Sequence, residues 1–186
     1  LRIKVKDADR SFVESEELID IAKEKDVALL VYGSPLSATT HISLINKAIK
    51  EKVKYKMLHA GSVVDAVAET GLQVYKFGKT ASLPKWQKNF TPDSFMEIIK
   101  ENQKIGAHSL LLIDIGLKFE DAREELKKSG FKADKVIVCS MLGVRSKIYY
   151  DKIENISAEK VKAPYCIIIP GKMSEVEVEA LGLVVK

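Results

Sequence analysis

The sequence predicts an α/β protein with a largely parallel sheet. Helical and strand-like patterns alternate along nearly the whole chain of 186 residues. Several strand-like runs end at a glycine, and the run at 109–115 is almost continuously apolar, which is typical of a strand covered on both faces. A hydrophobic content of 46% suffices for one large domain or two small ones.

The first part of the chain contains two strand, turn and helix patterns. The expected elements are strands at 27–32 and 55–58 and helices at 37–50 and 62–71. Each strand is followed by a glycine, and Ser62 with Asp65 forms a capping box. The rhythm pauses after Gly71, so we expect two α/β lobes, 1–71 and 72–186.

The second part continues with four strand-like runs and two helical ones. The expected strands lie at 74–83, 109–115, 136–141 and 165–169, and the helices at 91–105 and 119–129. Thr91-Pro92 resembles a helix start, with a capping hydroxyl before a proline. Residues 85–91 are the most loop-like, and the charged stretch 147–162 is expected to be a mobile connection.

Composition argues against several classes of protein. The 30 basic and 26 acidic residues leave a net charge of +4 without a basic tract, so nucleic-acid binding is not predicted. The apolar runs are too short to cross a membrane, and no signal peptide is visible, so a cytoplasmic protein is expected. Cys139 and Cys166 are expected to be reduced and buried, and the three histidines lack the spacing of metal ligands.

Glycine-bearing segments follow several of the expected strands. They are 33–36, 60–63, 114–116 and 141–143. In open α/β sheets ligands bind beyond the carboxyl ends of the strands, where glycine allows the backbone to approach closely. Together these segments could line one pocket, although each glycine could equally serve only its own turn.

Phosphate-binding and hydrolase motifs are missing. Gly78-Lys79-Thr80 and Gly171-Lys172 each lack the earlier glycine of a P-loop, and neither G-x-G-x-x-G nor G-x-S-x-G occurs. Asp114, at the end of a buried strand, could hold a sulfonium, a ribose or an amine, or could be a structural aspartate.

Several local strings are more specific. They are G-S-P-L-S-A-T-T-H (33–41), A-G-S (60–62), E-T-G-L (69–72), Y-K-F-G-K (75–79), A-H-S-L-L-L-I-D (107–114) and I-P-G-K (169–172). In this order they resemble the diphthine synthase family, over nearly the whole chain.

The resemblance implies a two-lobed, tetrapyrrole methylase-like fold with S-adenosyl-L-methionine in a cleft between the lobes and S-adenosyl-L-homocysteine as product. It implies a homodimer that methylates the amino group of a modified histidine, aminocarboxypropyl-histidine, of translation elongation factor 2. The cofactor-binding residues it implies are Ser34, Ser37, Ser62, Val63, Ile113, Leu142 and Tyr165.

The chain departs from the family pattern in four places. Ser34 stands where the family usually has Asp, Tyr165 where a His is common, and S-M-L-G at 140–143 where A-R-A-G is usual. The family's opening strand and its glycine-bearing loop are not in this sequence. Residues 1–71 would then be the remainder of the N-terminal lobe.

Methyl transfer from a sulfonium to an amine needs alignment and a neutral amine, without a metal. Asp114 is a candidate base, and bulk water is the alternative. Other functions stay open: a tetrapyrrole or other small-molecule methylase of the same fold, or a truncated, non-catalytic binding protein. The exposed lysines at 76, 79, 85 and 88 would either guide a protein substrate or form an ordinary solvated face.

Overall fold

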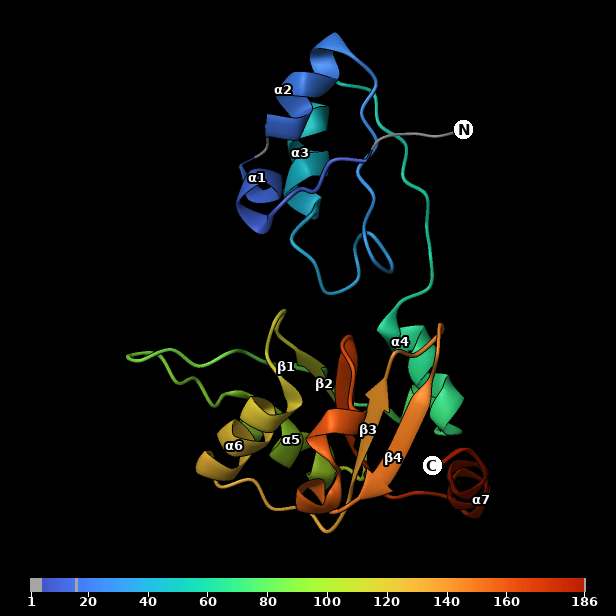
Figure 1. Cartoon of the computed structure of the whole chain (residues 1–186). Helices are drawn as coiled ribbons and strands as arrows, with labels where there is room; N and C mark the ends of the chain where they lie inside the picture. The colour runs from blue at the N-terminus through green and yellow to red at the C-terminus, as the bar shows by residue number, and fades with distance from the viewer. Residues whose placement is uncertain (1–4, 16, 186) are drawn as a thin grey trace. The chain divides into compact units, whose positions relative to one another are not determined.

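A computed structural model describes residues 5–15 and 17–185 (Figure 1). The chain separates into two compact units, Leu1–Ser62 and Val63–Lys186. The division of the chain into lobes after Gly71 stays a prediction. No helix in the described residues has the length and apolar character needed to cross a membrane.

The described residues of unit 1 form three helices, α1 (Arg10–Glu14), α2 (Glu17–Glu24) and α3 (Ile42–Lys50). Ile19 of α2 packs against Leu44 and Ala48 of α3 to form a small apolar core. Ion pairs join the same helices on the outside, where Lys23 contacts Glu51 and Lys47 contacts Asp20. The apolar stripes of α2 and α3 are thus what holds these helices together.

The two strands predicted in unit 1 do not form. Residues 27–32 and 55–58 are neither helical nor paired with any strand among the described residues. Leu30 is 71% exposed and Tyr55 is 52% exposed, so these apolar runs are not buried within unit 1. An extended run becomes a strand only when a neighbour satisfies its backbone groups, and periodicity alone does not supply that neighbour.

Unit 2 is built on one five-stranded sheet in the order β1-β2-β5-β3-β4. The strands are β1 (Ala81–Leu83), β2 (Ser109–Ile113), β3 (Val136–Ser140), β4 (Lys147–Asp151) and β5 (Tyr165–Ile169). Only β1 and β2 pair in parallel, and the other three pairings are antiparallel. The α/β class is confirmed, but the expectation of mostly parallel sheets in two α/β lobes is wrong.

The position of β5 explains this error. β1, β2 and β3 point the same way, as βαβ connections predict, because helices α5 (Phe95–Lys104) and α6 (Phe119–Lys128) carry the chain back each time. β5 then enters between β2 and β3 in the opposite direction. Its residues from Cys166 to Ile169 are buried, and a fully buried run does not reveal its direction in the sequence.

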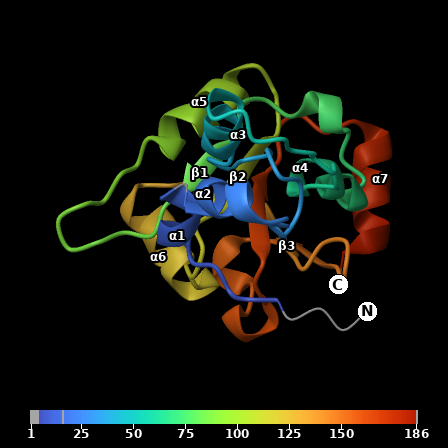
Figure 2. The same cartoon turned by 90° about the horizontal axis from the view of Figure 1, so that it is seen from above.

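Both faces of this sheet are covered (Figures 1 and 2). Leu111, Val138 and Ile167 pack against α5 and α6 on one face. On the other face, Ile137 and Ile168 pack with Leu181 of α7 (Glu175–Val184) and with Val67. Alternate residues of each central strand therefore serve two cores, which is why the runs read as continuously apolar.

Several local predictions are corrected. Of the strand expected at 74–83, only β1 forms, preceded by the short 3₁₀ helix η2 (Val74–Lys76). The helix 62–71 is divided into α4 (Val63–Ala66) and η1 (Val67–Thr70). The stretch 147–162 is not a loose connection: β4 pairs with β3, and η3 (Ile153–Asn155) and η4 (Ala158–Lys160) follow it. Cys139 and Cys166 are buried and free, as expected.

Candidate functional site

One edge of the unit 2 sheet gathers three of the seven residues predicted to bind the cofactor. Ile113 ends β2 beside Leu83, the last residue of β1. Tyr165 begins β5 and pairs with Ser140, the last residue of β3. Leu142 follows two residues later. We call this border, marked by Leu83, Ile113, Ser140 and Tyr165, the carboxyl edge.

Tyr165 is fixed from within the protein. Its hydroxyl donates to the carbonyl of Leu117 at 3.0 Å, and its ring meets Phe119 edge to face. Burial and the nearby carboxyl groups of Glu125 and Asp121 raise the pKa of Tyr165, so the phenol stays neutral. The hydroxyl is thus occupied, leaving the ring and the backbone of Tyr165 for any ligand at this edge.

The turn after β3 is also held firmly. Met141 has a left-handed φ of 55°, and its amide donates to the carbonyl of Pro164 at 2.8 Å. Gly143 donates to the Glu69 carboxylate at 2.8 Å. Leu142 lies between these two contacts and packs, half-buried, against the same core as Val63. The structure therefore brings Val63 and Leu142 to one face of the sheet.

Asp114 lies in the turn that follows β2, and its side chain is exposed. Its carboxylate accepts hydrogen bonds from the backbone amides of Ile115 at 2.9 Å and Lys85 at 3.3 Å. These contacts support the structural alternative for Asp114, because they tie the turn after β2 to the segment after β1. A role as base stays a prediction.

The remaining three predicted residues belong to unit 1. Ser34 and Ser37 lie in one turn, where the Ser37 amide donates to the carbonyl of Ser34 at 3.4 Å. The next residues fold back on that turn: the Thr39 hydroxyl donates to the carbonyl of Pro35 at 2.8 Å. Ser62 is half-buried at the end of the unit. No described contact tests their role with the cofactor.

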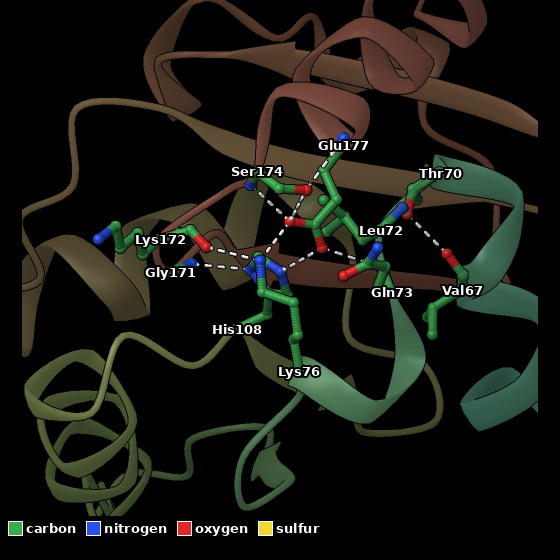
Figure 3. A network of polar contacts seen from close by, with 10 residues as sticks. All are labelled: Val67, Thr70, Leu72, Gln73, Lys76, His108, Gly171, Lys172, Ser174 and Glu177. Atoms are coloured by element: carbon green, nitrogen blue, oxygen red, sulfur yellow. Dashed lines mark hydrogen bonds and ion pairs between the residues drawn. The ribbon is translucent and has the colours of Figure 1, made fainter.

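A buried polar network in unit 2 was not predicted (Figure 3). At its centre the Glu177 side chain, on α7, is fully buried. One carboxylate oxygen accepts from the Gln73 amide at 3.0 Å and contacts His108 Nε2 at 3.1 Å. The other pairs with Lys76 and accepts from the Ser174 amide at 2.7 Å. Three separate chain segments, at 73–76, 108 and 174–177, thus meet on one carboxylate.

The hydrogen bonds assign the protonation state of the network. The amide of Gly171 donates to His108 Nδ1 at 2.9 Å, so the ring proton is on Nε2 and points at Glu177. Burial alone would raise the pKa of Glu177, but its bonds from Lys76, Ser174 and Gln73 hold that pKa well below its usual range. A neutral imidazole, an ammonium and a carboxylate result, which suits a structural clamp.

The two glycine-lysine strings that suggest phosphate binding belong to this packing. A Cβ at Gly171 would lie 2.4 Å from the carbonyl oxygens of both Ala107 and Gly106. A Cβ at Gly78 would lie 2.1 Å from the side-chain oxygen of Asn102. Glycine is required at both positions because neighbouring groups approach the backbone closely, and that accounts for these strings without a phosphate.

A second buried carboxyl group, Glu125 of α6, was also not predicted from the sequence. It is 8% exposed, and one oxygen accepts from the Trp86 amide at 2.9 Å. Its other oxygen has no hydrogen-bond partner among the described residues. Burial raises the pKa of Glu125. A charged residue within an amphipathic helix gives no sequence signal of such burial.

Comparisons with known proteins agree with this fold. Residues 4–157 match the family model of tetrapyrrole (corrin/porphyrin) methylases. The chain is 35% identical to a diphthine synthase of Methanococcus maripaludis, covering 96% of this chain and 76% of that protein. For a diphthine synthase of Methanocaldococcus jannaschii the identity is 37%, covering 89% and 71%. A crystal structure of a diphthine synthase superimposes with a TM-score of 0.82 at 29% identity, over 96% and 74%.

The chain is a tetrapyrrole methylase by family, which makes it a methyltransferase of the class that uses S-adenosylmethionine as methyl donor. Within that class it belongs to the diphthine synthase family, whose members act in diphthamide biosynthesis. The resemblance carried by the short strings is thereby confirmed.

Proposed function

We propose that this protein transfers methyl groups from S-adenosyl-L-methionine to the amino group of the aminocarboxypropyl-histidine of translation elongation factor 2, in the cytoplasm. Family membership supports the methyl transfer. The observation that carries the placement of the site is the strand register, which brings Ile113, Leu142 and Tyr165 to the carboxyl edge. We also propose that the protein acts as a homodimer, which sedimentation at working concentrations would test.

The residues at the carboxyl edge fit such a cofactor. None of the seven predicted binding residues is basic, and Ile113, Leu142 and Tyr165 offer half-buried apolar surface. A ligand without phosphate groups suits this set. Asp114 adds an exposed carboxylate beside Ile113, with which a positively charged centre is compatible. Ser34 provides a hydroxyl where the family usually has a carboxylate, so it contributes a neutral contact.

When bound, the cofactor supplies a methyl group on a sulfonium, and transfer is an in-line displacement that depends on alignment. This chain's residues have two tasks. The fixed ring of Tyr165 and the strained turn at Met141 hold the edge rigid, so that the bound molecules are positioned without reorganisation. The incoming amine must also lose a proton, which passes to solvent if Asp114 is structural.

The proposal is tested by incubating the protein with S-adenosylmethionine and elongation factor 2 that carries the modified histidine. The factor should gain mass in methyl increments, and factor with an unmodified histidine should not. Calorimetry with the cofactor, and competition by S-adenosylhomocysteine, would report binding separately. Cofactor binding without any mass gain would contradict the substrate, and no binding at all would favour a non-catalytic protein.

Asp114→Asn tests the structural role of that carboxylate. Asparagine keeps one acceptor oxygen for the turn, so we expect the methylation rate to change little across pH. A general base contributes about 10²–10⁴-fold to a rate. A loss of that size, together with a changed pH profile, would assign Asp114 to proton transfer instead. Asp93→Asn, which alters another exposed aspartate, is the matched control.

A further inference from the structure

A loop projects from unit 2 directly after β1, visible in green beside that strand in both views (Figures 1 and 2). We call residues 85–92 the arm. At its tip Gln87 and Phe90 exchange two backbone hydrogen bonds, of 2.9 and 3.0 Å, around a turn at Lys88 and Asn89. The tip of the arm is therefore a closed hairpin turn and not an irregular loop.

Three contacts anchor the base of the arm. The Lys85 amide donates to Asp114, and the Trp86 amide donates to the buried Glu125. The indole of Trp86 donates to the carbonyl of Pro92 at 3.0 Å, which closes the base on itself. For this reason Thr91-Pro92 belong to the arm, and α5 begins only at Phe95. A loop held in this way loses little further entropy on binding.

The tip has the composition of a docking surface. Lys85 and Lys88 are exposed, and no residue from Lys85 to Pro92 is acidic. Phe90 is 59% exposed although the arm is anchored, so its ring is not used by the protein's own core. Aromatic residues supply much of the energy at protein interfaces, while surrounding lysines steer an oppositely charged partner.

The arm starts at the candidate site. Leu83, the last residue of β1 and two residues before the arm, pairs with Ile113, and the Asp114 amide donates to the carbonyl of Leu83 at 3.1 Å. A small substrate would need only the edge itself. A macromolecule that presents one side chain at this edge would meet the arm with its surrounding surface.

We propose that the arm docks the protein substrate of the methyl transfer. Phe90 would enter an apolar depression on that protein, and Lys85 and Lys88 would face carboxylates around it. The inference rests on the proposed function, since it takes elongation factor 2 as the occupant. Docking by the arm would separate recognition of the protein from binding of the cofactor.

The test measures direct binding of elongation factor 2 to the wild type and to Phe90→Ala and Lys88→Glu. Each variant should weaken binding of the factor about tenfold or more, as expected for interface anchors, while calorimetry shows unchanged binding of S-adenosylmethionine. Tyr75→Ala and Lys100→Glu are matched controls, because both residues are exposed and lie outside the arm. Neither control should alter binding of the factor.

Unchanged binding of the factor by both arm variants, or no binding by the wild type, would overturn the inference. So would a Phe90→Ala variant that changes the oligomeric state while binding the factor normally, since the arm would then contact a second copy of this chain. Failure of the proposed function has a different signature: the wild type would bind the factor through the arm without transferring a methyl group to it.

Discussion

Replacing Glu177 by Gln should destabilise unit 2 by about 3–5 kcal/mol, the usual cost of removing one partner from a buried ion pair. The side chain is fully buried and receives bonds from Lys76, Gln73, Ser174 and His108. An amide in its place would turn donors toward donors and leave the Lys76 ammonium uncompensated. Denaturant unfolding at neutral pH, followed by circular dichroism, measures the loss.

The pH dependence gives a second readout of the same residue. Because the folded-state pKa of Glu177 lies below its ordinary value of 4.5, its contribution to stability is present above about pH 4.5. That contribution is lost as the pH falls through the lowered pKa. The difference between wild type and Glu177→Gln should therefore shrink in acid. A difference that is small at neutral pH, or constant with pH, would contradict the clamp.

A matched control is available on the surface. Glu101 forms an ion pair with Lys79 at 2.6 Å, with both side chains more than half exposed. Glu101→Gln removes the same chemical group from a pair that water screens, so no measurable change in unfolding is expected. The comparison isolates burial as the cause of the Glu177 effect.

The sequence predicted most of the unit 2 framework because apolar runs and helix patterns there coincide with real burial. β2, β3 and β5 lie where the runs at 109–115, 136–141 and 165–169 place them. The pairing partners of the strands could not be predicted in the same way. The insertion of β5, and the lack of strands in the part of unit 1 that the structure describes, depend on which backbone groups find a neighbour, which no local pattern encodes.

In the candidate site, likewise, positions could be predicted but contacts could not. Positions at strand ends, such as Ile113 and Tyr165, follow from where a run stops. The contacts that decide the chemistry of the site join residues that are distant in the sequence: Tyr165 donates to Leu117, and Asp114 accepts from Lys85. Glu177 was missed because the C-terminal helix that carries it was not predicted. His108 and Lys76, in contrast, lie within the strings that carried the family resemblance.

Gly171→Ala should also be strongly destabilising, because the new methyl group would lie 2.4 Å from two backbone carbonyl oxygens, those of Gly106 and Ala107. Neither oxygen belongs to a flexible side chain that can move aside. The Gly171 amide donates to His108 Nδ1, and the next residue, Lys172, donates to Gly106 at 2.9 Å. Displacing Gly171 therefore breaks both bonds and shifts the start of α7.

We expect this change to cost about 3 kcal/mol or more, the range of severe overpacking with loss of buried hydrogen bonds. Gly182→Ala is the control, since nothing lies within 4 Å of a Cβ there and the residue is inside α7. It should stabilise the protein by about 0.5–1 kcal/mol through helix propensity. If both alanine variants unfold like the wild type, then the segment at Gly171 is not tightly packed, and the clamp around Glu177 loses its second support.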